Sequence, residues 1–298
     1  MFVFWDIDGT LMTCGGDGTK ALNRTFLDLY GIDGAFTGRG VGSAMDSVLL
    51  GNIMKTHGIA EDDRVLIESV YFTNLKKNLT GNPYKTVLPG VINILDHINS
   101  KDGWYNLLLT SNLKEAARIK LDSVGLWQYF SAAAAGGFGD SHGEKWDVLS
   151  SVLEELSVQA GRSVRSGEVL IIGDSVYDIR TAKQLGVGYI AVASGWTSKG
   201  KLEEEHLKHR LPVSVDRTPE TAPLAQTGGS VDELSAESAR DAAAAQTAAR
   251  DKIPVGAEES MNNTASQHTG LRIEVLLDNL ADSDIVIDYL ETLKENIQ

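Results

Sequence analysis

Runs of apolar residues recur along the chain, separated by segments in which apolar positions follow a helical period. The apolar runs are continuous rather than alternating, and they are rich in leucine and β-branched residues. This pattern is typical of strands that are buried on both faces of a parallel sheet. We expect strands at residues 2–7, 105–110, 169–175, 189–194 and 273–279, and helices at residues 91–99, 114–125, 145–156, 177–186 and 283–293.

The alternation of strands and helices predicts the α/β class, with a Rossmann-like, doubly wound parallel sheet. One segment, residues 131–139, leaves two alternatives open. Its four consecutive alanines favour a helix. The order of the elements around it favours a strand.

The pattern changes between Gly15 and about Tyr84. Three stretches there, residues 19–31, 44–58 and 61–79, have helical periodicity, and no convincing strand lies between them. We expect a small all-helical cap domain, residues 16–84, inserted after the first strand. Glycines at its entry could act as a hinge.

A second change begins after residue 211. Four of the six prolines lie in residues 212–270, and this stretch contains no aromatic residue and few large aliphatic ones. Such a segment cannot bury enough apolar surface to offset the entropy lost on ordering. We predict a disordered low-complexity insertion at 212–270, within an α/β core made of residues 1–15, 85–211 and 271–298.

Composition narrows the range of partners and compartments. The formal net charge of −14 disfavours a nucleic acid or an anionic membrane as a partner. A single cysteine, Cys14, excludes an intrachain disulfide and suits a reducing compartment. No apolar run approaches the roughly 20 residues that a membrane helix needs. We expect a cytoplasmic protein, and both monomer and homodimer remain open.

Polar side chains follow three of the predicted strands where each strand ends. Asp6 and Asp8 follow the first strand, Asp174 and Asp178 follow the strand at 169–175, and the strand at 105–110 ends in Thr110, Ser111 and Asn112. Ligands of open α/β sheets bind beyond the carboxyl ends of the strands, so these groups should meet in one crevice. Like charges so close together cannot all ionise freely, and a bound Mg²⁺ would relieve the repulsion. Because Mg²⁺ readily shares its shell with phosphate oxygens, the pattern favours phosphate chemistry.

The motifs DIDGT at residues 6–10, LLLTSN at 107–112 and GDSVYD at 173–178, together with Lys145, resemble those of the haloacid dehalogenase superfamily. The helical insertion resembles the small cap of its phosphoglycolate-phosphatase-like branch. The resemblance covers about residues 1–197 and resumes at 271–293.

The resemblance implies roles for the acidic residues. Asp6 would be the nucleophile that forms an aspartyl-phosphate, and Asp8 would protonate the leaving alcohol and then activate water. The metal would be held by Asp6, Asp8 (through its main-chain carbonyl), Asp174 and Asp178. For Asp178, capping of the following helix is an equally good explanation. An acid at position 8 favours phosphoryl transfer, because the true dehalogenases of the family lack one there.

The resemblance also implies contacts with the substrate. Thr110 and Ser111 would bind the phosphoryl group, and Lys145 would neutralise its charge and that of the nucleophile. Arg39 and Asp46, in the helical segment, are candidate substrate contacts. The single cysteine is expected to be a small buried side chain, and the six histidines show no ligand spacing.

We therefore expect a Mg²⁺-dependent phosphatase that hydrolyses small phosphorylated metabolites. One alternative is a phosphomutase of the same fold, which would pass the phosphoryl group to a sugar. Another is a non-catalytic protein that binds a partner through the crevice or through residues 212–270.

Overall fold

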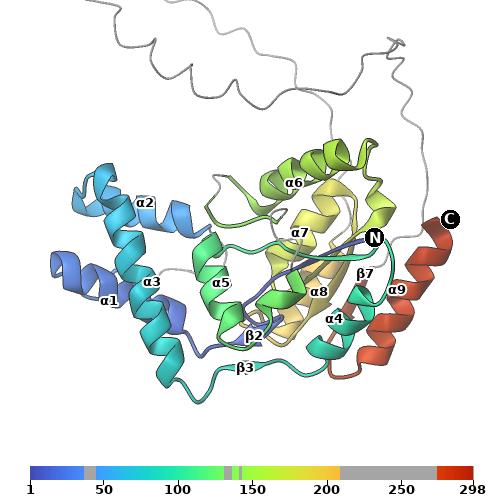
Figure 1. The fold of residues 1–298 in the computed structure, drawn as a ribbon, viewed down its shortest axis with the longest axis horizontal. Helices are drawn as coiled ribbons and strands as arrows, with labels where there is room; N and C mark the ends of the chain where they lie inside the picture. Colours follow the sequence, from blue (N-terminus) through green and yellow to red (C-terminus); the bar gives the residue numbers. More distant parts are fainter. Residues whose placement is uncertain (37–44, 131–135, 141–142, 209–273, 298) are drawn as a thin grey trace, which may run out of the picture. The chain divides into compact units, whose positions relative to one another are not determined.

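Among the described residues, five strands form a parallel sheet (Figure 1). The computed structural model describes residues 1–36, 45–130, 136–140, 143–208 and 274–297. The strands are β1 (Phe2–Trp5), β4 (Tyr105–Leu108), β5 (Val169–Gly173), β6 (Gly188–Val192) and β7 (Glu274–Leu277). Their order across the sheet is β4-β1-β5-β6-β7, and each pairing is parallel.

Residues along β1 alternate between two hydrophobic layers. Val3 and Trp5 belong to one buried cluster, whereas Phe2 and Phe4 belong to a second. Successive side chains of a strand point to opposite faces, so the continuous apolar runs place a core on each side of the sheet. This arrangement confirms the predicted fold class.

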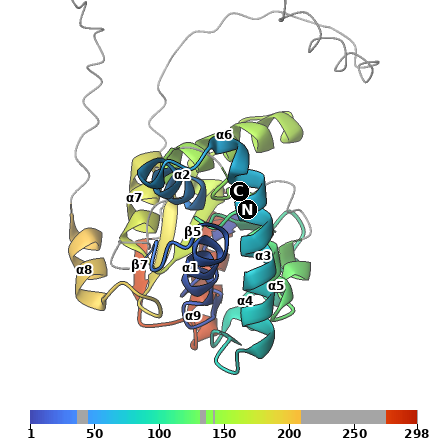
Figure 2. The ribbon, with the colours of Figure 1, turned by 90° about the vertical axis from the view of Figure 1, so that its left-hand side faces the viewer.

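Helices cover both layers, as Figures 1 and 2 show. The first cluster includes apolar side chains of α4 (Val91–Asn99), α5 (Lys114–Asp122) and α9 (Ser283–Ile297). The second includes those of α6 (Lys145–Ala160), α7 (Val176–Leu185) and α8 (Lys199–Leu207). Short 3-10 helices η2 (Trp127–Phe130) and η3 (Ser166–Glu168) lie in the connections.

The segment after β1 is helical where the structure describes it. It contains α1 (Asp17–Tyr30), α2 (Asp46–His57), the 3-10 turn η1 (Glu61–Asp63) and α3 (Arg64–Gly81). Two short strands, β2 (Met12–Thr13) and β3 (Thr86–Val87), pair antiparallel at its two ends. The sequence analysis did not predict this pair, because two residues are too few to show a strand period. That residues 16–84 form a separate cap domain stays a prediction.

The open alternative at residues 131–139 is resolved for its described end. Gly137 forms a parallel bridge with Leu109, and Thr110 N donates to Gly137 O at 2.9 Å. Residues 136–138 therefore run beside the end of β4 and are not helical, as the order of the elements predicted.

Two predictions concern residues that the structure does not describe. Arg39 and the insertion at 212–270 lie outside the described residues. The described residues belong to one compact unit, Met1–Arg210 with Thr269–Gln298. Among their helices, none combines the length and the apolar character needed to cross a bilayer.

Candidate active site

The loop after β1 brings two acids to the edge of the sheet. Asp6 N still donates to Ile172 O at 3.0 Å, so Asp6 continues the strand pairing. The chain then turns sharply at Gly9, whose φ is 86°. A Cβ at Gly9 would lie 2.7 Å from Asp174 Oδ2, so only glycine allows the turn to approach that carboxylate.

Three of the predicted acids meet in one group. Oxygens of Asp6, Asp174 and Asp178 all lie within 4.8 Å of one another. Asp6 follows β1 and Asp174 follows β5, and these neighbouring strands flank the point where the strand order reverses. Asp178 comes from the first turn of α7 and is buried. The topology of the sheet thus gathers these carboxylates from distant parts of the chain.

Lys145, the first residue of α6, lies beside two of these acids, Asp6 and Asp178. Its ammonium is buried and is 2.6 Å from Asp178 Oδ1 and 3.3 Å from Asp6 Oδ1. Burial acts to lower the pKa of Lys145, but the charges of Asp178 and Asp6 act more strongly in the opposite direction. The pKa of Lys145 is therefore above its usual value, and the ammonium stays charged. We call this set, Asp6, Asp174, Asp178 and Lys145, the acid cluster.

The acid cluster has more negative than positive groups. Burial raises the pKa of Asp6 to about 6. The positive charge of Lys145 lowers this pKa, whereas the neighbouring acids raise it. Burial and the charge of Asp6 raise the pKa of Asp174 to about 8. A set of crowded, buried carboxylate oxygens with too little positive charge fits a hard divalent cation. The donor chemistry of the cluster is therefore suited to hold such an ion.

Asp178 also caps α7. Ser175 N and Oγ donate to Asp178 Oδ2 at 3.1 and 2.6 Å, and Asp178 N donates back to Ser175 Oγ at 3.3 Å. Its other oxygen, Oδ1, accepts from Lys145. The capping role left open by the sequence is therefore present, and it leaves Asp178 within the acid cluster.

Asp8 occupies a different environment from Asp6. Its Oδ2 accepts from Lys120 Nζ at 2.6 Å and from Asn112 Nδ2 at 2.9 Å, and its Oδ1 lies 3.7 Å from Cys14 Sγ. Burial acts to raise the pKa of Asp8, but Lys120 and the hydrogen bonds lower it more. The Asp8 carboxylate is thus held ionised outside the acid cluster.

Lys120 was missed by the sequence analysis. It is buried on α5 and also donates to Asn112 Oδ1 at 2.6 Å. A signal was present, because Lys120 follows the buried Ala116 by four residues and so shares the apolar face of the helix. A lysine on such a face needs a buried partner.

The residues after β4 connect to Asp8. Thr110 is fully buried, and its Oγ1 accepts from Asn112 Nδ2 at 2.8 Å. The main-chain carbonyl of Ser111 accepts from Asp46 N at 2.9 Å. Phosphate binding by Thr110 and Ser111 stays a prediction.

Asp46 begins α2 and is joined to this loop. Its Oδ2 accepts from Leu113 N at 3.3 Å, and the next residue, Ser47, donates from its N to Gly139 O at 3.0 Å. Burial raises the pKa of Asp46 to about 6, although Lys120 and the bond from Leu113 oppose the shift. In this structure Asp46 ties the start of α2 to the core, and its predicted contact with substrate is not tested.

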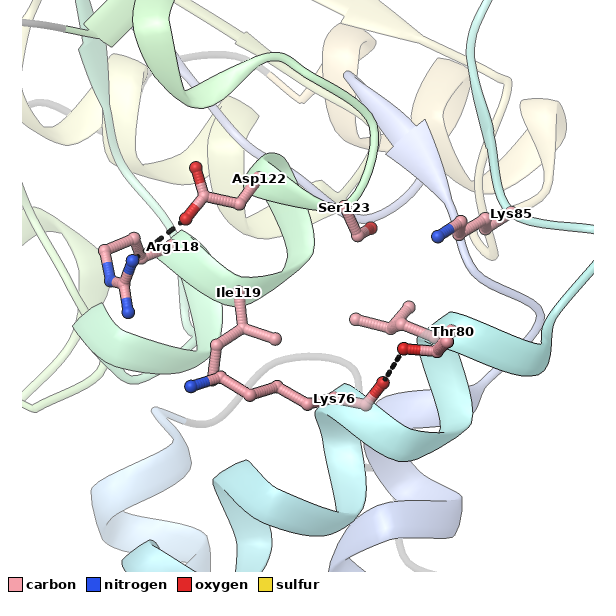
Figure 3. A pocket seen from close by; sticks show the side chains of 8 residues that line it. Lys76, Thr80, Lys85, Arg118, Ile119, Asp122 and Ser123 are labelled. Atoms are coloured by element: carbon pink, nitrogen blue, oxygen red, sulfur yellow. Dashed lines mark hydrogen bonds and ion pairs between the residues drawn. The ribbon is translucent and has the colours of Figure 1, made fainter.

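A cavity of about 490 Å³ lies elsewhere, between α3 and α5 (Figure 3). Its lining contains none of the predicted site residues and consists of Lys76, Leu79, Thr80, Lys85, Arg118, Ile119, Asp122 and Ser123. Arg118 pairs with Asp122 at 2.9 Å, as the dashed line in Figure 3 shows. The cavity shares no residue with the acid cluster or with the Asp8 network.

Known proteins resemble this chain over about two thirds of its length. Phosphoglycolate phosphatase from Mesorhizobium japonicum is 27% identical over 211 residues, covering 68% of this chain and 87% of the relative. A plasmid phosphoglycolate phosphatase from Cupriavidus necator is 27% identical over 205 residues, covering 66% and 83%. The structure of CbbY from Rhodobacter sphaeroides in complex with phosphate shares the fold. It has a TM-score of 0.51 and 17% identity, and the match covers 66% of this chain and 88% of that chain.

A family model gives the assignment. The model of the haloacid dehalogenase-like hydrolases matches residues 3–192, which is more than half of the chain. This range contains β4, β5, β6 and all but the first residue of β1, together with the acid cluster and the Asp8 network. The chain therefore belongs to the haloacid dehalogenase-like hydrolases.

Proposed function

We propose that this protein is a Mg²⁺-dependent phosphatase that hydrolyses small phosphate monoesters through an aspartyl-phosphate. The observation that carries the proposal is the meeting of Asp6, Asp174 and Asp178, two of which contact Lys145, with Asp8 two residues from Asp6. The two phosphoglycolate phosphatases among the relatives support a small phosphorylated metabolite as substrate.

Asp6 is the nucleophile of the proposed reaction. Its carboxylate attacks phosphorus and the bond from phosphorus to the ester oxygen breaks, while Asp8 gives a proton to the departing alcohol. Asp8, now ionised, takes a proton from water, which attacks the aspartyl-phosphate and releases Asp6 and inorganic phosphate. The ionised Asp8 of the structure is the form that the second step requires. The first step requires Asp8 to carry a proton, and the negative charge of the substrate phosphate nearby favours the protonated carboxyl group of Asp8.

Three further groups would support the phosphoryl group. Lys145 offsets the charge of Asp6 and of the transferring group, and Thr110 and Ser111 would donate hydrogen bonds to phosphate oxygens. A bound Mg²⁺ would be held by the carboxylates of Asp6, Asp174 and Asp178 and by the main-chain carbonyl of Asp8, and it would supply positive charge to the phosphoryl oxygens. A cytoplasmic location and a monomeric or dimeric state stay predictions.

Substitution of the nucleophile tests the proposal. We expect wild-type protein with Mg²⁺ to release phosphate from p-nitrophenyl phosphate, and Asp6→Asn to abolish turnover, because an amide cannot attack phosphorus. Lys114→Met, on the exposed face of α5, is the matched control and should keep activity. Wild-type activity in Asp6→Asn would remove the nucleophile from the proposal.

Two measurements define the product and substrate. A panel of phosphorylated metabolites, assayed for free phosphate with Mg²⁺, identifies the ester that gives the highest kcat/KM. Product analysis on sugar phosphates separates hydrolysis from isomerisation. A product that is an isomerised sugar phosphate rather than free phosphate would favour the phosphomutase.

A further inference from the structure

Lys120 is a buried cation to which the proposed mechanism assigns no role. Of the described lysines, only Lys120 and Lys145 are buried. Lys145 is accounted for by the acid cluster. Taking an ammonium out of water is costly unless hydrogen bonds and an opposite charge replace its hydration. Lys120 finds both in Asp8 Oδ2 and Asn112 Oδ1, each at 2.6 Å.

The contacts distinguish the two oxygens of Asp8. Oδ2 accepts from both Lys120 and Asn112, at 2.6 and 2.9 Å. Within the described residues, the contact recorded for Oδ1 is the weak one with Cys14 Sγ at 3.7 Å. Oδ2 is therefore anchored, and Oδ1 is the oxygen left to exchange a proton with a substrate. A third of the Asp8 side chain is exposed (33%), so a ligand can approach it.

Asn112 closes the arrangement. Its amide nitrogen donates to Asp8 Oδ2 and to Thr110 Oγ1, while its carbonyl oxygen accepts from Lys120. Lys120 therefore fixes the direction of the Asn112 amide as well as the Asp8 carboxylate. The start of α1 lies close to its ammonium, since a Cβ on Gly18 would lie 3.4 Å from Lys120 Nζ.

We propose that Lys120 is a positioning residue, whose ammonium anchors Oδ2 of Asp8 so that Oδ1 is presented to the leaving-group oxygen. This inference rests on the proposed function, because it assumes that Asp8 is the proton donor. Lys120 itself does not touch the reacting atoms. Its removal leaves the nucleophile and the acid cluster in place and disturbs the proton transfer.

Leaving-group dependence tests the proposal. Phenolate is a poorer leaving group than p-nitrophenolate and needs the proton more, so a misplaced Asp8 should harm phenyl phosphate hydrolysis selectively. For Lys120→Met we expect kcat/KM on phenyl phosphate to fall by roughly 100-fold, the scale of a 1 Å misplacement. On p-nitrophenyl phosphate, kcat/KM should fall by only about tenfold. Lys114→Met, on the exposed face of the same helix, should leave the ratio of the two substrates unchanged.

The ratio of the two substrates is independent of the folded fraction, because both are hydrolysed by the same sample. Lys120→Arg keeps the charge and should restore part of the ratio. Ethylammonium added to Lys120→Ala should rescue phenyl phosphate more than p-nitrophenyl phosphate. Equal losses on both substrates, or no loss in Lys120→Met, would overturn the proposal.

The proposed function is tested separately. If Asp6→Asn abolishes turnover while Lys120→Met lowers both substrates equally, only the role of Lys120 fails. If Asp6→Asn keeps its activity, the proposed function fails whatever Lys120 does.

Discussion

Asp6 and Asp8 lie two residues apart on one loop, yet their pKa values move in opposite directions. Burial raises the pKa of Asp6 to about 6, and Lys145 only partly offsets it because Asp178 and Asp8 add negative charge. Burial also acts to raise the pKa of Asp8, but Lys120 and two hydrogen bonds outweigh it. The difference is set by the neighbours of each carboxyl group, since the residue type is the same.

The two regions also differ in how well their charges are balanced. The Asp8 network balances one carboxylate with one ammonium and an amide, so its charge is satisfied by the protein alone. The acid cluster sets three carboxylates against one ammonium and is short of positive charge. The comparison therefore predicts that a cation matters for the acid cluster and much less for the Asp8 network.

Removal and addition of metal should separate the two regions most clearly. Chelation with EDTA should abolish turnover, and saturating Mg²⁺ should raise the Tm of the metal-free protein. Binding at 100 times Kd stabilises the folded state by about 2.7 kcal/mol. For a domain of this size, that free energy corresponds to a rise of roughly 5–10 °C.

Two variants serve as controls for this measurement. The Tm of each is measured by thermal unfolding with and without Mg²⁺. Asp174→Asn removes a carboxylate of the acid cluster and should lose most of the rise in Tm. Asp8→Asn leaves the main-chain carbonyl in place and should keep it. An equal rise in both variants would mean that the ion does not bind at the acid cluster.

The two buried lysines should differ in their effect on stability. Lys145→Met removes the counter-charge of the crowded acids and breaks the buried pair with Asp178, and breaking such a pair typically costs about 3–5 kcal/mol of unfolding free energy. Lys120→Met leaves one carboxylate that is a third exposed and can be hydrated, so it should cost less. Urea denaturation of the metal-free proteins at neutral pH measures the difference. A greater loss in Lys120→Met would contradict the comparison.

Asp46 gives the smallest expected effect and sharpens the comparison, because it is half-buried near Lys120 and forms no ion pair among the described residues. Burial raises the pKa of Asp46 to about 6 in the folded protein. Between about pH 4 and pH 6 the folded state binds this proton more tightly than the unfolded state, so the contribution of Asp46 to stability falls as pH rises.

Asp46→Asn removes that titration. As pH rises from 4 to 7, the Tm of Asp46→Asn should rise relative to the Tm of the wild type. Each 1 kcal/mol of stability that the wild type loses through this titration corresponds to about 2–4 °C. Thermal unfolding across this range measures it. A difference that stays constant with pH would show that Asp46 does not titrate there.

The sequence by itself determined the fold class and the meeting of the three acids Asp6, Asp174 and Asp178. Continuous apolar runs predict a parallel sheet with both faces covered, and the carboxyl ends of neighbouring parallel strands must lie at one edge. Asp6 and Asp174 therefore had to meet once the strands were placed. Asp178 followed, because a helix begins directly after its strand.

Only the tertiary structure decided the partner of Asp8 and the place of Asp46. Lys120 lies 112 residues from Asp8, and Asp46 N reaches Ser111 O across 65 positions of the chain. Hydrophobic periodicity places each element by its own buried face, and it carries no information on which polar group of another element meets a given side chain. That pairing depends on how helices α2 and α5 pack against the end of the sheet, which is settled by the folded chain as a whole.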